Sequence, residues 1–461
     1  MGGGYSYGDD SPIAAFATVP GGSALTTIRC CGKGALELAE TIFSAPEKLR
    51  QAAGNTVLHG WIVAPNDEKI DEVLLSVFRA PKSYTGEDGF DISCHGGSAA
   101  GRGVMDAVRA AGFRDALPGE FTFRAFMNGK LDLSRSEAVM ELVSAKTDAG
   151  RRYAINRLSG VLEQEINRIK KQLVEILSGV EVFLDYSEDE IGADADETAG
   201  RFSGRQGTEE ALSRLRTLAQ SWQRQRIYQE GILAVIAGRP NAGKSSLFNL
   251  LLKEERSIVT AIPGTTRDWI EAWVSIEGIP LRLADTAGLR DESPDPVENL
   301  GVERSRALLE AAELVIYLID GAAGITDEDA HFIQQPPSKP LIVLWNKADI
   351  APPPPSCAFD AISISAKTGE GMAELTAAIA KAAMPQAETH DPALGSARQK
   401  NLVEAAAAAL EQALTLAERE EPLDLIAPLL REAINSLGEI TGEVSTANLL
   451  EEIFSRFCVG K

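Results

Sequence analysis

The sequence predicts a multi-domain chain of the α/β and α classes, in which a mainly parallel α/β domain interrupts a helical one. Between residues 231 and 384, short apolar segments alternate with helix-like segments, which is typical of a parallel sheet covered by helices. On both sides of this stretch, apolar residues recur every three or four positions, as on an amphipathic helix. The 461 residues leave room for about three domains of roughly 150 residues each.

The first part of the chain, residues 1–134, mixes β-like runs at 56–64 and 73–78 with glycine, proline and one or two helical stretches. This pattern favours an α+β domain. From residue 136 to about 185 the apolar periodicity predicts one long amphipathic helix, which includes Ile155 and Leu158. An acidic break at 185–198 follows, and helical periodicity resumes at 212–228. We therefore assign residues 135–230 to the first segment of a helical domain.

The inserted domain, 231–384, is expected to hold five strands, at 232–237, 281–284, 314–319, 341–345 and 361–365. Residues 398–419 and 423–457 are again helical in pattern. We expect residues 385–461 to pack back on residues 135–230, which makes the helical domain discontinuous.

The composition indicates a folded protein with a strongly acidic surface: 44% of residues are hydrophobic and the formal net charge is −22. Such a chain repels a polyanion, so we expect RNA to be held mainly by a second protein. The simpler reading is that the charge only keeps the protein soluble. Five scattered cysteines argue against a disulfide framework or a zinc site, and the absence of a signal-like or 18-residue apolar stretch favours the cytoplasm over a membrane.

Residues 238–246 read GRPNAGKSS and follow an apolar strand candidate, so they fit the phosphate-loop pattern G-x4-G-K-[ST]. In this pattern glycines let backbone N–H groups surround phosphate oxygens, the lysine neutralises charge and the serine hydroxyl binds Mg²⁺. The predicted contacts are Asn241, Ala242, Gly243, Lys244, Ser245 and Ser246. The loop alone indicates a nucleoside triphosphate without specifying the base.

Four later segments follow in the order that a guanine-nucleotide domain requires: IPGTTRD (262–268), DTAG (285–288), NKAD (346–349) and SAK (365–367). In NKAD (346–349) the Asp349 carboxylate can accept hydrogen bonds from guanine N1–H and its 2-amino group. The DTAG segment (285–288) places a carboxylate near Mg²⁺ and a glycine N–H near the γ-phosphate. Together these segments predict GTP, with contacts from Thr265, Thr266, Asp285, Thr286, Ala287, Gly288, Asn346, Lys347, Ala348, Asp349, Ser365, Ala366 and Lys367.

The hydrolytic group is less obvious, because the residue after DTAG is Leu289 rather than a water-orienting glutamine. The following loop, 290–300, offers four carboxylates: Asp291, Glu292, Asp295 and Glu298. No arginine finger is identifiable. A polar group outside the usual position must therefore orient the attacking water.

Several motifs outside the inserted domain resemble those of the tRNA-modification GTPase family MnmE, also called TrmE. They are YTGED (84–88), HGG (95–97), PGEFTFRAFMNGKLDLSRSEA (118–138), LGEITGE (437–443) and the final FCVGK (457–461). With GRPNAGKSSL, they extend the resemblance over essentially the whole chain.

The resemblance implies an N-terminal domain similar to folate-dependent aminomethyltransferases, a discontinuous helical domain and an inserted P-loop G domain. It also implies a homodimer formed through the N-terminal domain, and a heterotetramer with an FAD-binding MnmG-type partner. The pair would add an aminomethyl or carboxymethylaminomethyl group to C5 of the wobble uridine, position 34, in certain tRNAs. FAD would lie on the partner, and tRNA would bind mainly through the complex.

The same resemblance implies K⁺ near the phosphates, held by Asn241, Thr260, Ile262 and Thr265, with Ala261, Pro263 and Gly264 in the same nucleotide-contacting loop. A fixed cation can replace an arginine finger. Mg²⁺ would be bound by Ser245 and Thr266, and Glu298 aligns with the family's catalytic glutamate.

For a tetrahydrofolate such as 5-formyltetrahydrofolate, the family positions fall on Arg29, Asp91, Lys130 and Lys461. Asp91 replaces the usual glutamate, so its carboxylate reaches one methylene less far. The stretch before Arg29, PGGSALTT, also departs from the family pattern. Cys458 is open to two interpretations, a nucleophile in the modification chemistry or a packed tail residue.

Two alternatives remain. A regulatory or ribosome-assembly GTPase that binds RNA directly would need a basic appendage, which the charge of −22 and the FCVGK ending disfavour. A one-carbon transferase that the G domain only regulates would need a complete catalytic set within residues 1–134, and no such set can be assembled.

Overall fold

The computed structural model describes residues 6–19, 21–185, 202, 204–254, 271–285, 307–335, 339–354, 360–383 and 392–461. These residues form two compact units. The first contains residues 1–140, 158–214 and 402–461, and the second contains residues 141–157 and 215–401. Helical sequence is therefore shared between the units, and the predicted boundaries at 134, 230 and 384 stay predictions.

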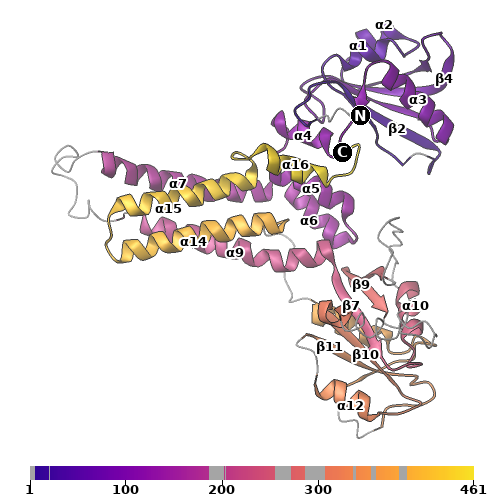
Figure 1. The fold of residues 1–461 in the computed structure, drawn as a ribbon, viewed down its shortest axis with the longest axis vertical. Coiled ribbons are helices and arrows are strands. Elements are labelled where there is room, and N and C mark those ends of the chain that lie inside the picture. Colours follow the sequence, from indigo (N-terminus) through magenta and orange to yellow (C-terminus); the bar gives the residue numbers. More distant parts are fainter. Residues whose placement is uncertain are drawn as a thin grey trace, which may run out of the picture. The chain divides into compact units, whose positions relative to one another are not determined.

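The N-terminal part of the first unit is an α+β fold around a six-stranded sheet (Figure 1). Its strand order is β3-β4-β5-β2-β1-β6, and every pair is antiparallel except β1 with β6. The strands are β1 (Ile13–Phe16), β2 (Leu25–Cys31), β3 (Thr56–Val63), β4 (Lys69–Phe78), β5 (Gly89–His95) and β6 (Arg114–Asp115). The α+β prediction is confirmed.

One face of this sheet is buried and the other carries exposed apolar side chains. Val73, Leu75 and Ile92 pack with Val104 and Val108 of α3 (Ser98–Ala110) in one core cluster. Fully burying a side chain of this size contributes about 1.5–3 kcal/mol. The short helices α1 (Ala35–Glu40) and α2 (Pro46–Gln51) contribute to the same core.

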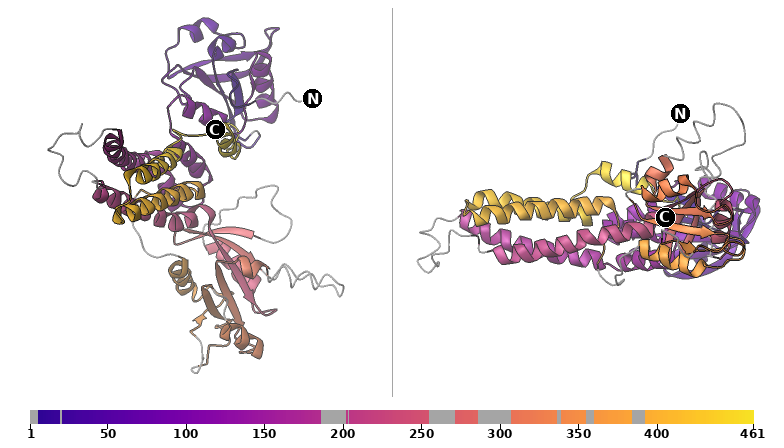
Figure 2. Two further views of the ribbon diagram at one scale, coloured as in Figure 1. Left: turned by 60° about the vertical axis from the view of Figure 1, so that its left-hand side comes forward. Right: turned by 90° about the horizontal axis from the view of Figure 1, so that it is seen from below.

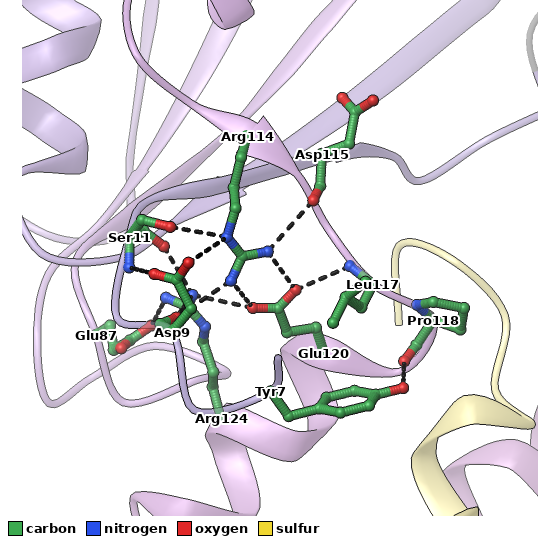
Figure 3. A network of polar contacts seen from close by, with 10 residues as sticks. All are labelled: Tyr7, Asp9, Ser11, Glu87, Arg114, Asp115, Leu117, Pro118, Glu120 and Arg124. Atoms are coloured by element: carbon green, nitrogen blue, oxygen red, sulfur yellow. Dashed lines mark hydrogen bonds and ion pairs between the residues drawn. The ribbon is translucent and has the colours of Figure 1, made fainter. Parts of the chain in front are cut away.

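A buried ion network holds α4 (Glu120–Met127) against the start of the chain (Figure 3). Glu120 is fully buried; its Oε2 accepts hydrogen bonds from Arg114 (2.8 Å) and from the Leu117 backbone N–H (2.8 Å). Arg124 donates to Glu120 Oε1 at 3.1 Å and to the Ser11 carbonyl at 2.7 Å. Removing one charged side chain would leave its partner buried without a counter-charge. We therefore expect replacement of Arg114, Glu120 or Arg124 to lower the free energy of unfolding by about 3–5 kcal/mol.

The helical part of the first unit is built on α7 (Val161–Asp185) and α15 (Leu423–Thr441), which lie side by side (Figure 2). Leu162, Ile166, Ile169 and Leu173 of α7 are fully buried. The unit also contains α16 (Ala447–Ser455) and parts of α5 (Leu133–Ser144), α9 (Arg205–Glu230) and α14 (Ala397–Glu418). Among the described residues, no helix is both long and apolar enough to cross a lipid bilayer.

The prediction of one long helix over 136–185 is wrong. The structure divides this stretch into α5, α6 (Asp148–Leu158) and α7. Gly160 has φ of 91°, a left-handed conformation that ends a helix. Ile155, expected on the buried face, is 42% exposed on α6.

The sheet in the second unit has the order β12-β11-β10-β7-β9-β8, with all pairs parallel except β8 with β9. Its strands are β7 (Ile232–Gly238), β8 (Glu271–Ile276), β9 (Ile279–Asp285), β10 (Leu314–Asp320), β11 (Leu341–Asn346) and β12 (Ile362–Ser363). Its helices include α10 (Lys244–Glu254), α12 (Asp327–Gln334) and α13 (Met372–Ala383). The mainly parallel sheet is confirmed, and the antiparallel edge strand β8 was not predicted.

Candidate functional site

The phosphate loop connects β7 to α10, as the sequence predicted. Gly238 has φ of 140°, and a Cβ there would lie 2.5 Å from the Leu318 carbonyl oxygen. Gly243 has φ of 101°, and a Cβ there would lie 2.2 Å from Nδ2 of Asn346. Both positions require glycine, because an L side chain is strained at these positive φ values and its Cβ would collide with the neighbouring atom.

The loop places a cation and helix-terminal groups around the space it encloses. Lys244 is buried, and its Nζ donates to the carbonyls of Gly238 (2.9 Å) and Arg239 (2.8 Å). Ser245 and Ser246 are exposed in the first turn of the 11-residue helix α10, where backbone N–H groups favour anions. Asn241 is exposed in the loop, with φ of 61°. This arrangement suits a polyphosphate.

Asn346 joins three predicted segments. Its side chain is 2% exposed at the end of β11. Nδ2 donates to the Ala242 carbonyl in the phosphate loop at 2.7 Å, and Oδ1 accepts from the Ala366 backbone N–H at 2.9 Å. One side chain therefore fixes the phosphate loop, the NKAD segment and the loop at 365–367 relative to one another.

The residues after Asn346 present the groups expected to read the base. Lys347, in the left-handed region at φ of 66°, donates from Nζ to Asp320 Oδ2 at 2.6 Å. Burial opposes ionisation of Asp320, but the hydrogen bond and charge of Lys347, together with the backbone N–H groups of Ala322 and Ala323, outweigh it and hold the pKa of Asp320 below its usual value. Asp349 and Lys367 are exposed, whereas Ser365 is buried and its Oγ accepts from the Thr368 N–H at 3.2 Å. Ala348 donates its N–H to the Ile364 carbonyl.

Part of the predicted nucleotide site lies outside the described residues. This holds for Glu298 and for Thr260, Ala261, Ile262, Pro263, Gly264, Thr265, Thr266, Thr286, Ala287 and Gly288. The backbone of Asp285 ends β9 opposite Ile236 of β7, one strand from the phosphate loop. The roles assigned to these residues stay predictions.

A second candidate site is a cavity of about 80 Å³ in the N-terminal domain. Arg29 of β2 and Asp91 of β5 face each other across the strand pair. Arg29 donates from Nε and Nη2 to the two carboxylate oxygens of Asp91, at 3.1 and 3.2 Å. Arg29 also donates to the Gly460 carbonyl at 3.4 Å. The cavity is lined by Arg29, Cys30, Cys31, Phe78, Ser83, Tyr84, Thr85, Glu87, Gly89, Asp91 and Phe121.

The four predicted folate residues divide into two pairs. Arg29 and Asp91 line the cavity. Lys130 donates from Nζ to the Pro81 carbonyl at 2.9 Å, and Lys461 is exposed; neither lines the cavity. Sequence reasoning missed Tyr84 and Phe121, although both lie in motifs already noted. An aromatic side chain inside a ligand-binding motif is the signal that could have identified them.

The cysteines differ in environment. Burial raises the pKa of the Cys30 and Cys31 thiols well above the ordinary range, and it raises the pKa of Cys94 to about 11. Cys458 is exposed, and its carbonyl accepts from the Gly119 N–H at 3.3 Å. The helix before it is anchored by packing, because Leu450, Phe454 and Phe457 are buried together with Phe123 and Leu133.

His95 has a local partner rather than a metal site. Its Nδ1 lies 2.7 Å from Asp71 Oδ1, and its side chain is 65% exposed. In the part of the chain that the structure describes, no three His, Cys, Asp or Glu side chains are grouped to bind a metal ion.

Two protein families match this chain. The family described as the GTP-binding protein TrmE N-terminus matches residues 12–130, and the MnmE helical domain family matches residues 133–458. Among solved structures, a variant of Aquifex aeolicus Era bound to GDP and aluminium fluoride is similar over 39% of this chain and 66% of that chain, with 26% identity and a TM-score of 0.28.

Full-length relatives agree with these families. The tRNA modification GTPase MnmE of Treponema denticola is 42% identical over 99% of this chain and 99% of its own length. The protein of the same name from Symbiobacterium thermophilum is 42% identical over 98% of this chain and 100% of its own length. The chain therefore belongs to the MnmE family of tRNA modification GTPases.

Proposed function

We propose that this GTPase, together with an FAD-binding MnmG-type partner, adds an aminomethyl or carboxymethylaminomethyl group to C5 of the wobble uridine, position 34, in certain tRNAs. Membership of the MnmE family is the observation that carries the proposal. The bridge from Asn346 to Ala242 and Ala366 supports the nucleotide half, because it holds the phosphate loop and the base-reading loops together. GTP hydrolysis would then drive a rearrangement of the G domain that controls the modification centre.

The Mg²⁺ and K⁺ ions of the proposed reaction would be bound at the phosphate loop. Ser245, exposed in the first turn of α10, presents a hydroxyl suited to Mg²⁺, and Thr266 would be its second protein ligand. Asn241 presents an amide oxygen in an exposed loop, which fits a K⁺ ligand, and Thr260, Ile262 and Thr265 would complete that site. A cation there would stabilise negative charge that develops between the β- and γ-phosphates.

Glu298 is the proposed group that positions the attacking water. Hydrolysis of GTP by the purified chain tests both the K⁺ site and the role of Glu298. We expect faster turnover in K⁺ than in Na⁺, and we expect Glu298→Ala to bind GTP normally but to lose hydrolysis. Equal rates of hydrolysis in the two salts would contradict the proposed K⁺ site. Weakened GTP binding with hydrolysis retained in Glu298→Ala would mean that Glu298 has a different role.

The N-terminal cavity is the proposed site of a tetrahydrofolate, for example 5-formyltetrahydrofolate. At about 80 Å³ it is much smaller than the roughly 300–1,000 Å³ of typical ligand pockets, so only the flat heterocyclic end would enter. The residues fit such a group: Tyr84 and Phe121 supply rings, and Asp91 supplies hydrogen-bond acceptors. Bound folate would supply the one-carbon unit. Lys130, Lys461 and Cys458 would act outside the cavity, Cys458 either in the chemistry or in packing.

The proposed homodimer forms through the N-terminal domain. Three apolar side chains on the uncovered face of its sheet support this: Leu25 (61% exposed), Val57 (61%) and Leu74 (49%). The MnmG-type partner would complete a heterotetramer, carry FAD and contribute most of the tRNA-binding surface. We place the complex in the cytoplasm.

Mass analysis of wobble uridines in tRNA tests the proposed function. In cells that lack this protein we expect the C5 substituent to disappear, and we expect the wild-type chain to restore it. Gly243→Ala, which disrupts the phosphate loop, should fail to restore it. Unchanged nucleosides in the deletion strain would overturn the proposal and would favour a regulatory or ribosome-assembly GTPase that binds RNA directly.

A further inference from the structure

A larger cavity, of about 680 Å³, lies in the second unit away from the nucleotide site. Ile232 and Leu314, the first residues of β7 and β10, line it. The phosphate loop leaves β7 at the opposite, carboxyl end, which a seven-residue strand places about 20 Å away. This cavity, called the groove from here on, is therefore separate from the proposed GTP site, and none of the roles described above uses it.

The groove is lined by more cations than anions. Arg224 and Arg226 of α9 and Lys400 of α14 contribute positive charge, and Glu313 is the acidic residue in the lining. Arg226 forms an ion pair with Glu313, whose Oε2 also accepts from the Leu233 N–H at 3.3 Å. This pair offsets its own charges. The other two cations of the described lining are Arg224 and Lys400, and Lys400 also has an interaction of its own.

Arg224 is the most available of these cations. Its side chain is exposed, and no carboxylate in the described ranges lies within ion-pair distance of it. Gln220 and Gln223 lie on the same helix and also line the groove, so amide donors accompany the guanidinium. Guanidinium and amide groups at one surface are the donors that proteins use for phosphate and sugar oxygens.

The sequence around Arg224 is locally basic. Residues 211–229 contain four arginines and no aspartate or glutamate, in a protein whose net charge is −22. A polyanion approaching this chain would be repelled over most of its surface and attracted where the local charge is reversed. The basic run and the groove coincide on α9.

We propose that this groove binds the phosphate backbone of RNA, with Arg224 and Lys400 contacting phosphates and Gln220 and Gln223 contacting sugar or phosphate oxygens. The inference rests on the proposed function, which supplies tRNA as the substrate. Contacts of this kind position the nucleic acid without reading its sequence. The groove would add a local contact to the main tRNA surface carried by the partner protein.

Binding of a fluorescently labelled, unmodified tRNA transcript to the full chain, measured by anisotropy over roughly 50–250 mM KCl, tests the proposal. We expect Arg224→Gln to weaken binding several-fold and to lower the slope of log affinity against log salt by about one. Arg224→Glu should weaken it further. GTP hydrolysis and the melting temperature should stay close to wild-type values, because the exposed Arg224 side chain lies away from the phosphate loop and forms no ion pair with a described carboxylate.

Arg152→Gln is the matched control, because Arg152 is an exposed arginine of the same unit that pairs with Asp148 outside the groove. It should bind tRNA like the wild type. The proposal is overturned if Arg224→Gln keeps wild-type affinity and slope, if Arg152→Gln loses as much, or if the chain binds no tRNA. Displacement of the tRNA by polyglutamate at equal charge concentration would also overturn it, in favour of an acidic protein partner. None of these results alters the wobble-uridine measurement, so failure here and failure of the proposed function are distinguishable.

Discussion

The nucleotide site and the N-terminal cavity are built in different ways. The phosphate loop depends on backbone conformation within one short segment, where Gly243 cannot carry a side chain and Lys244 is held by loop carbonyls. The cavity depends on side chains from distant segments: Arg29 bonds to Asp91, 62 positions away, and to Gly460, 431 positions away. A site of the first kind can be recognised in a sequence, whereas a site of the second kind exists only once the sheet has paired.

The largest predicted effect tests the backbone-dependent site. In Gly243→Ala, the added Cβ would lie 2.2 Å from Nδ2 of Asn346, at a backbone φ of 101°. Strain of about 2–4 kcal/mol would lower GTP affinity roughly 30- to 1,000-fold. Titration of the purified variant with a fluorescent GTP analogue measures the change.

Gly278→Ala is the control for this variant. Gly278 also has a left-handed backbone, with φ of 81°, but no neighbouring atom lies within 4 Å of the point that an added Cβ would occupy. We expect a loss of about 1 kcal/mol in stability and wild-type GTP affinity. If both alanine variants bind GTP equally well, close approach of Asn346 to the loop is not what the site requires.

A moderate effect is expected in the N-terminal cavity. Asp91→Asn removes the carboxylate that holds Arg29 at 3.1 and 3.2 Å, and it leaves a partly buried guanidinium without its ion-pair partner. We expect affinity for 5-formyltetrahydrofolate to fall about tenfold, while GTP binding is unchanged. Asp115→Asn, which changes an exposed aspartate paired with Arg109, should bind the folate normally. Calorimetry with undiminished folate affinity in Asp91→Asn would place the ligand elsewhere.

The smallest effect concerns a carboxyl pair in the first unit. Burial, and then the neighbouring Asp132, raise the pKa of Glu163 to about 7 from an ordinary 4.5, although Arg135 opposes the shift. A raised carboxyl pKa stabilises the fold fully below about pH 4.5 and loses that contribution as the pH rises through about 7. Glu163 is about one third exposed, so solvent screening limits the effect to about 1 kcal/mol.

We therefore expect Glu163→Gln to raise the melting temperature by about 2 °C at pH 8 and to change it little at pH 5. Thermal scans of wild type and variant at the two pH values measure the difference. A variant that is less stable than the wild type at pH 8 would show that the Glu163 charge is favourable in the fold.

The same contrast explains how much could be predicted from the sequence. The loop around Gly243 follows from motif spacing, because a contiguous motif encodes its own backbone. The bridge from Asn346 to Ala242, 104 positions earlier, was not predicted, because it joins segments that meet only in the folded sheet. The network of Arg114, Glu120 and Arg124 could not be predicted, since its other members lie about 100 positions earlier at Asp9 and Ser11.

Two errors in the predicted fold have local causes. Apolar periodicity does not detect a helix break such as the one at Gly160, so three helices were predicted as one. Among the described strands, β8 pairs with β9 alone, and its sequence EAWVSI lacks the continuous apolar run that identified the buried parallel strands. Both features become visible only in the folded chain.

The central claim is that three loops joined by Asn346 form a site for guanine nucleotides. Titration of the full chain with fluorescent GTP and ATP analogues tests it most directly. Because Asp349 would accept from guanine donors that adenine lacks, we predict that GTP binds at least about 100-fold more tightly than ATP. Equal affinity for the two nucleotides, or no binding of either, would contradict it.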